Sequence, residues 1–261
     1  MAAEAGGGIL GALDELNVHT FIKIPHVWKF DFSITNAVVY VWFSALVVFV
    51  LFYVAARIAR KKPGKLQTLA EVVLNFGLNL TGIYTSKGKK YYYIYATIFS
   101  FIFITNLIGL IPKPAGIWPY TPTANISVTF SMAIVIFALT QYFGIKNHGV
   151  RGYTSTFLMP KDVPTGIRRA MNVIFFPVEI LGQLFRPLSL SVRLFANTIA
   201  GHIIILVMLG MLLQYRFPVG GVTGLFVIAM TAFEIFVAFI QAYIFSLLSV
   251  VYLEGAMADS H

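Results

Sequence analysis

The chain has 261 residues, of which 58% are hydrophobic and only 11% charged, and its mean hydropathy is +0.82. Soluble domains carry about 25% charged residues, so a soluble protein of this composition would lack the polar surface that water requires. The net charge of +9 does not indicate nucleic-acid binding, because Lys and Arg cluster between apolar runs, and the absence of cysteine excludes disulfides and thiolate metal sites.

The first 35 residues form a mixed segment that we expect to be external. It has no basic region ahead of an apolar core, so no cleaved signal peptide is expected. Three aromatic residues suit a membrane boundary: Trp28, Phe30 and Phe32. The first predicted span, about residues 36–56, has no Asp, Glu, Lys, Arg or His and matches the roughly 20 apolar residues that a bilayer requires. A basic cluster at 57–65 then ends it on the cytoplasmic side.

Residues 66–86 predict an amphipathic helix that lies on the membrane rather than crossing it. Its apolar positions recur at spacings of three and four: Leu66, Leu69, Val73, Phe76 and Leu80. Its polar positions lie on other faces: Gln67, Glu71, Asn75 and Asn79. Lys87, Lys89 and Lys90 then hold the chain on the cytoplasmic side.

The next two predicted spans are residues 91–111 and about 124–145. Prolines at 112 and 114 stop the first of them, and a short outer loop with Trp118 and Tyr120 follows. The second ends at Lys146, where a polar loop, 146–170, begins. Its five basic residues make this loop cytoplasmic.

Two long apolar segments, about 171–213 and 218–256, complete the chain and are separated at Arg216-Phe217-Pro218. At ~1.5 Å per residue, about 43 helical residues reach roughly 64 Å, against a hydrocarbon core of about 30 Å. The first segment cannot be two spans, because the piece before Pro187 is too short. We therefore expect a strongly tilted hairpin, which needs a protein partner because lipid alone would not hold oblique helices.

The basic residues decide the expected orientation. The proposed inner loops carry thirteen of them, whereas the outer segments carry only Lys23, Lys29, Lys113 and Arg216. The predicted fold is an all-α polytopic membrane protein with one membrane domain, 36–256. It has five transmembrane helices and one amphipathic helix, an outside N-terminus, and a short cytoplasmic tail at 257–261. The expected location is the cell membrane.

Ionisable residues inside the predicted spans are confined to the final hairpin. The first three spans have no Asp, Glu, Lys, Arg or His, whereas five such residues stand out in the hairpin: Glu179, Arg186, Arg193, His202 and Glu234. Charges at membrane depth are costly and mark ion or substrate paths by default. This concentration therefore indicates a transport function.

Helical spacing arranges these residues further. Glu179, Arg186 and Arg193 are seven apart, so they share one face with about 20° drift per step. Ser189 and Asn197 lie four residues either side of Arg193, close to the same stripe. His202 is nine residues beyond Arg193 and faces a different neighbour.

Folding the hairpin at Phe217-Pro218 brings two pairs level. Gln241 is level with Arg193, and Glu234 with His202, nearer the outside. Glu179 lies about 21 Å from Arg193 toward the cytoplasm. This layout predicts two half-paths that meet at a fixed positive charge.

Most of these residues also have a structural interpretation. Arg186 can snorkel or form a structural ion pair, and Glu179 can be a surface acid near the helix start. Ser189, Asn197 and Gln241 can be polar groups that pack helices together. Arg193 lies too deep to snorkel easily.

Four motifs resemble the subunit a family of the membrane sector of F-type, rotary ATP synthases, in its bacterial form. The longest is residues 187–202, PLSLSVRLFANTIAGH, and residues 241–253, QAYIFSLLSVVYL, are similar to the family's last helix. Residues 106–112, NLIGLIP, and 122–129, PTANISVT, also fit in order. The likeness covers about residues 36–256.

The resemblance implies partners and roles. The partners are a ring of c subunits with an essential membrane carboxylate and b-type subunits of a peripheral stalk. Arg193 matches the arginine that faces this ring, and Asn197 and Gln241 match residues near it. His202 and Glu234 match a Glu and a His of many bacterial members, exchanged here as in mitochondrial ones. No cofactor or metal is implied, and the chain is expected to be a non-catalytic channel subunit.

Three other functions remain open from the residues alone. A secondary transporter would show a repeat between the halves of the chain, and none is evident. An intramembrane enzyme would need a His-Glu-x-x-His motif, which is absent, or a nucleophile beside His202, for which the sequence offers no plausible candidate. The sequence also has no GxxxxGK[ST] nucleotide-binding loop. A pure stalk anchor would not need the charged residues of the hairpin.

Overall fold

The computed structural model describes residues 20–22, 33–57, 64–82, 88–111, 121–155, 165–214 and 219–257. Several features discussed above therefore lie outside the described residues. They are most of the N-terminal segment with Trp28, Phe30 and Phe32, the outer loop with Trp118 and Tyr120, the turn at 215–218, and the last four residues.

The described chain is built almost wholly of helices. Two short strands, β1 (Thr20–Ile22) and β2 (Ile34–Thr35), pair antiparallel ahead of the first long helix. The helices are α2 (Asn36–Arg57), α3 (Lys65–Gly82), α4 (Tyr92–Leu110), α5 (Ile126–Ser155), α6 (Thr165–Gln214) and α7 (Val219–Met257). Two single 3-10 turns, η2 (Gly88–Tyr91) and η3 (Pro122–Ala124), precede α4 and α5.

Five of these helices are long and apolar enough to cross a membrane, which confirms the predicted fold class. The exception is α3, the helix predicted to be amphipathic. Its buried face packs on α4 and α2, whereas Leu66 and Leu69, which were predicted to lie on the same apolar stripe as Leu80, stay exposed, as does Val72.

Two boundaries were predicted wrongly. The polar loop expected at 146–170 is partly helical, because α5 continues to Ser155 and α6 begins at Thr165. Basic and polar residues are compatible with a helix that continues out of an apolar layer, so charge marks the end of a span and not the end of its helix. Gly149, at φ 68°, kinks α5 where it continues past the span.

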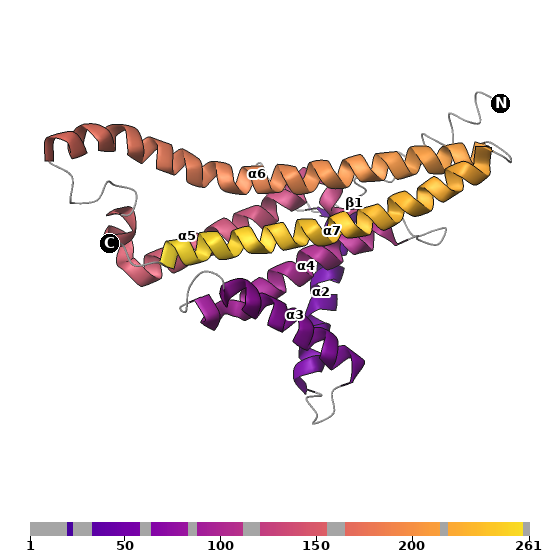
Figure 1. Cartoon of the computed structure of the whole chain (residues 1–261), viewed down its shortest axis with the longest axis horizontal. Coiled ribbons are helices and arrows are strands. Elements are labelled where there is room, and N and C mark those ends of the chain that lie inside the picture. Colours follow the sequence, from indigo (N-terminus) through magenta and orange to yellow (C-terminus); the bar gives the residue numbers. More distant parts are fainter. Residues whose placement is uncertain are drawn as a thin grey trace.

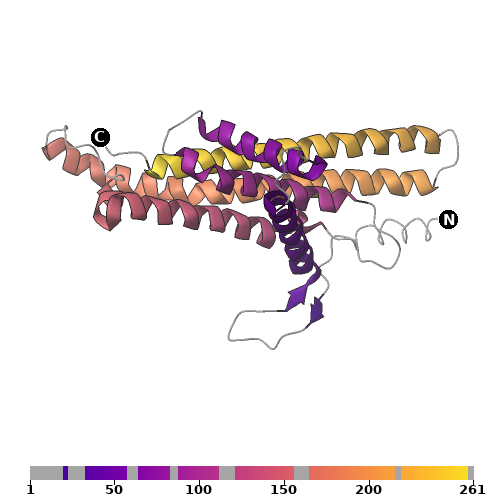
Figure 2. The same cartoon turned by 90° about the horizontal axis from the view of Figure 1, so that it is seen from below.

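The final pair forms one long antiparallel hairpin (Figures 1 and 2). Helix α6 has 50 residues, about 75 Å, and continues through Pro177 and Pro187, as expected of a single unbroken segment. Helix α7 packs along α6 and α4, and α5 packs against both hairpin helices. In Figure 1, α2 runs across the direction of the hairpin. The hairpin and α2 therefore cannot both stand along the same membrane normal.

The core lies where α4, α5 and the hairpin meet. It contains residues from all four helices: Phe99, Ile102, Ala133, Ile136, Leu190, Leu194, Ala242 and Phe245. Lipid tails are as apolar as these side chains, so close packing rather than exclusion from water holds the helices together. Leu190 and Leu194 fix which face of α6 points inward.

Candidate functional site

His202 and Glu234 line one cavity of about 160 Å³ between α4, α6 and α7. Its polar lining also includes Asn106 and Asn197. The structure thus brings together the two residues that the hairpin register placed level. We refer to this space as the His202–Glu234 cavity.

The two hairpin helices approach closely at this cavity because residue 201 is glycine. A Cβ atom on Gly201 would collide with the carboxylate of Glu234. The acid of α7 therefore lies directly against the α6 backbone, one residue before His202. A side chain at position 201 would displace this acid.

Polar groups in the His202–Glu234 cavity are only partly satisfied by protein. His202 is buried, and its Nε2 lies 2.9 Å from the hydroxyl of Thr121. One oxygen each of Glu234 and Asn106 has no hydrogen-bond partner within the described part of the chain. A cavity of this size has room for water molecules, which can bridge such groups and carry protons between them.

Arg193 and Gln241 belong to different surfaces. Arg193 is exposed on α6, although the adjacent face of the helix carries the buried Leu190, Ser191 and Leu194. Gln241 is only 5% exposed and faces the core, where its amide nitrogen has no partner among the described residues. Their neighbours Leu194 and Ala242 belong to one core cluster, but no hydrogen bond joins Arg193 and Gln241 in the described chain.

The residues that flank Arg193 share its exposed face. Ser189, Ala196, Asn197 and Ala200 are all exposed there. Small and polar side chains let another helix come close to the backbone. The small side chains on this face therefore leave the α6 backbone accessible around Arg193.

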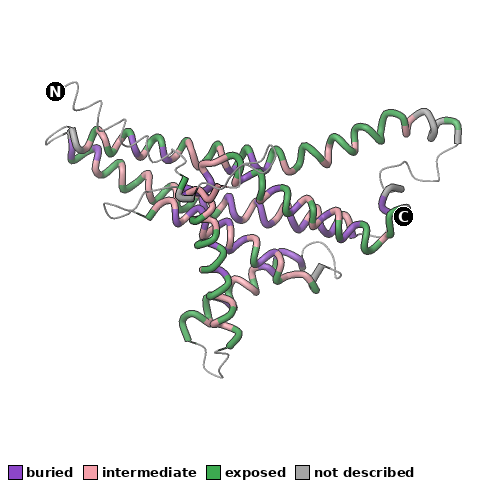
Figure 3. Tube along the Cα trace, turned by 180° about the vertical axis from the view of Figure 1, so that it is seen from behind, coloured by how far each residue is buried: buried purple, intermediate pink, exposed green. Residues whose placement is uncertain are grey.

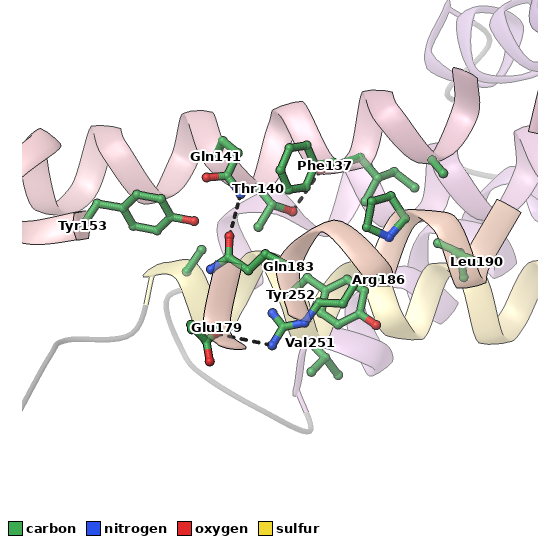
Figure 4. A pocket seen from close by; sticks show the side chains of 15 residues that line it. Phe137, Thr140, Gln141, Tyr153, Glu179, Gln183, Arg186, Leu190, Val251 and Tyr252 are labelled. Carbon is green, nitrogen blue, oxygen red and sulfur yellow. Dashed lines mark hydrogen bonds and ion pairs between the residues drawn. The ribbon is translucent and has the colours of Figure 1, made fainter. Parts of the chain in front are cut away.

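Glu179 and Arg186 line a second cavity, of about 390 Å³, between α5, α6 and the end of α7 (Figure 4). Their side chains form an ion pair at 3.7 Å and are about 44% and 43% exposed. The guanidinium carbon also lies 5.1 Å from the centre of the Tyr252 ring. Of the two interpretations of Arg186, the structure thus shows the ion pair. We refer to this space as the Glu179–Arg186 cavity.

Uncharged polar residues complete the Glu179–Arg186 cavity. The amide of Gln141 on α5 donates to the amide oxygen of Gln183 on α6 at 2.9 Å. Tyr153 lies beside them because the Gly149 kink turns the end of α5, and Gly144 leaves room for its ring. Burial raises the pKa of the Tyr153 phenol above its usual range.

Sequence reasoning missed several residues at these cavities. Thr121, Gln141, Gln183 and Tyr153 are uncharged, so a search for membrane-depth charges passes over them. Glu254, which lines neither cavity, was also missed, although it is a charged residue within the last predicted span, 218–256. It is in fact only 4% exposed, on the α4 side of α7, where its charge acts on the buried Tyr95.

Comparison with known sequences decides the family. The sequence profile described as ATP synthase A chain matches residues 38–254, which include every hairpin residue discussed above. The chain belongs to this ATP synthase A chain family. Membership makes it a multi-pass membrane subunit concerned with ATP synthesis and ion transport, and the F-type resemblance noted in the sequence is confirmed.

Full-length relatives support membership in the ATP synthase A chain family. The chain is 38% identical over 248 residues to ATP synthase subunit a of Rubrobacter xylanophilus, covering 92% of this chain and 93% of the relative. Identity is 32% to the subunit a of a Wolbachia from Brugia malayi, over 95% of this chain and 99% of the relative. Identity to ATP synthase subunit a of Mesorhizobium japonicum is 33%, over 93% of this chain and 95% of the relative.

Proposed function

We propose that this A chain is the proton-conducting stator of a rotary ATP synthase, and that it loads and unloads the carboxylates of a rotating c-ring. One observation carries the proposal. The α6–α7 hairpin lines the His202–Glu234 cavity and a separate Glu179–Arg186 cavity, with an exposed Arg193 at an intermediate position along α6. Two polar spaces separated by a cation suit two half-paths better than one continuous channel.

The large exposed surface of the α6–α7 hairpin favours a large protein partner on this side. Only 17% of the most apolar window of α6 and 11% of that of α7 is buried, against 44% in α4. Figure 3 shows exposed residues along much of α6, most continuously in its first half. A ring of c subunits would cover this face and hold the hairpin oblique to the bilayer.

Proton entry is assigned to the His202–Glu234 cavity. A proton from outside passes the imidazole and the acid and neutralises a ring carboxylate. Neutralisation is required because an unpaired carboxylate could not enter lipid. The neutral site then rotates through the bilayer and returns to the stator.

Proton exit is assigned to Arg193 and the Glu179–Arg186 cavity. The returning acid meets Arg193, whose positive charge favours the ionised carboxylate, so the proton is released. Ser189 and Asn197 supply polar groups on the same exposed face, whereas Gln241 lies buried behind it. The released proton leaves past Glu179. Arg193 also repels any proton that would cross directly between the cavities.

The driving force of this cycle comes from the membrane potential. Each elementary charge moved across 100 mV yields about 2.3 kcal/mol, and several together can drive ATP formation in another part of the complex. The A chain contributes no nucleotide-binding motif to that step. Its proposed neighbours are the c-ring, b-type stalk subunits and the lipid of the cell membrane.

Purification of the assembled complex tests the proposed partner. An affinity tag on this chain should retain a small helical-hairpin protein in many copies per A chain, each copy with one membrane carboxylate. The copy number follows from mass spectrometry of the intact complex in mild detergent. A complex that makes ATP but holds no such multi-copy protein would remove the basis of the mechanism.

Orientation has a separate test. With an outside N-terminus, a cysteine at Thr20 in β1 should react with an impermeant thiol reagent added outside intact cells. A cysteine at Lys65, the exposed first residue of α3, should react only after the membrane is opened. The wild-type chain has no cysteine, so labelling reports these positions alone. Outside labelling of Lys65→Cys would reverse the assigned topology.

A further inference from the structure

A threonine outside the hairpin holds the imidazole of the His202–Glu234 cavity. Thr121 immediately precedes η3 and is only 6% exposed. Its Oγ1 lies 2.9 Å from Nε2 of His202, a residue 81 positions further along the chain. No charge or motif of the hairpin points to this contact.

The position of Thr121 is fixed by packing on several sides. A Cβ atom on Gly109 of α4 would occupy the space that the Thr121 side chain fills, so this glycine admits the threonine. The turn that follows, η3, packs against α6, α4, α5 and α2. The hydroxyl is therefore presented to His202 from a support that does not depend on the α6–α7 contact.

A hydroxyl is chemically suited to an imidazole that changes its protonation state. When Nε2 carries a hydrogen, the threonine oxygen accepts it, and when Nε2 is bare, the threonine hydroxyl donates to it. The contact can thus persist in both states with only a rotation of the hydroxyl hydrogen. Valine, which has nearly the same shape, can do neither.

We propose that Thr121 is a positioning residue for proton entry, which orients the His202 ring beside Glu234 and stabilises its protonated form. This inference rests on the proposed function of the His202–Glu234 cavity and adds a residue to it. Thr121 does not itself carry the proton in this scheme.

The pH dependence of proton flux can report on His202 because few ionisable groups share its cavity. In the described structure, α4 contributes Asn106 to this cavity, α7 contributes Glu234, and α6 contributes Asn197. Thr121 is added from the segment before η3. Among the residues that line this cavity, His202 and Glu234 are the two ionisable ones. A change at Thr121 therefore acts first on the His202–Glu234 pair.

The test is proton flux into vesicles that hold the assembled complex, measured against external pH. Thr121→Val should lower the flux about fivefold, because one hydrogen bond to the ring is lost. It should also lower the pH of half-maximal flux by about 0.7 units. The hydrogen bond to the Thr121 oxygen stabilises the protonated imidazole more than the neutral one, so its loss favours the neutral ring. Thr121→Ser keeps the hydroxyl and should stay near wild type.

Thr123 provides the matched control. It lies in η3, is fully buried, and its hydroxyl has no hydrogen-bond partner among the described residues. Thr123→Val makes the same chemical change two positions away and should alter neither the flux nor its pH midpoint. If Thr121→Val does not assemble, the smaller Thr121→Ala carries the same expectation.

The outcomes separate this inference from the function on which it rests. A Thr121→Val complex with wild-type flux and midpoint rejects the positioning role, provided that His202→Ala abolishes the flux. Equal effects of Thr121→Val and Thr123→Val would also reject it, since the turn would then matter only for packing. A His202→Ala complex with wild-type flux would instead overturn the proposed entry path itself.

Discussion

Arg193→Ala is expected to abolish ATP synthesis driven by a proton gradient and to open a passive proton leak through the assembled complex. Arg193 is the exposed cation at an intermediate position along α6, between the two cavities of the hairpin. Without it, nothing favours release of the proton from a returning carboxylate, and no fixed charge separates the half-paths. Both effects can be measured in vesicles that hold the complete complex, as ATP formed and as proton flux without nucleotide.

Two further substitutions make the Arg193 result specific. Arg193→Lys keeps the formal charge but should still lower synthesis about tenfold, because an ammonium lacks the planar donor fork and can lose its proton. Arg186→Ala removes a cation seven residues away on the same helix, but that cation is paired with Glu179 and should matter less. If Arg193→Ala makes ATP near the wild-type rate, the residue is a packing or snorkelling arginine and the mechanism is wrong.

The second large effect is expected when the residues of the His202–Glu234 cavity are exchanged. His202→Glu and Glu234→His should each lower proton flux about tenfold, because each leaves two like groups facing one another. The double exchange should recover flux to within about threefold of wild type, since residues in one network couple by roughly 0.5–3 kcal/mol. The measurement is again flux in vesicles, with assembly checked for each variant.

Proximity can be tested without relying on transport. Cysteines placed at 202 and 234 should crosslink in the assembled complex, because both side chains line one cavity. A cysteine at Glu179 paired with one at 234 should not, because those residues line separate cavities. A double exchange that is no better than the single variants would show that the acid and the imidazole do not act as one unit.

Much of the architecture could be predicted from the sequence because the decisive signals are local. The length of an apolar run determines whether it can cross a bilayer, and five runs were found where five such helices occur. Helical periodicity placed Arg193, Ser189 and Asn197 on one face, and all three are exposed there. The turn position set the hairpin register and so put His202 level with Glu234.

Local signals predicted the ends of helices less well. The basic residues after the third span indicated where the apolar layer ends, yet α5 continues beyond Lys146, through a kink at Gly149, to Ser155. Hydropathy reports the surroundings of a segment, whereas helix ends depend on capping and packing. The early start of α6 at Thr165 has the same explanation.

What only the tertiary structure decided is which residue meets which across helices. Thr121 contacts His202, Gln141 contacts Gln183, and the missing side chain of Gly201 admits Glu234. The sequence by itself determined the number of spans, the charged hairpin and the exposed face of Arg193. Periodicity specifies the direction in which a side chain points, but its neighbour depends on how separate helices pack, and that packing is set by contacts between residues far apart in the chain.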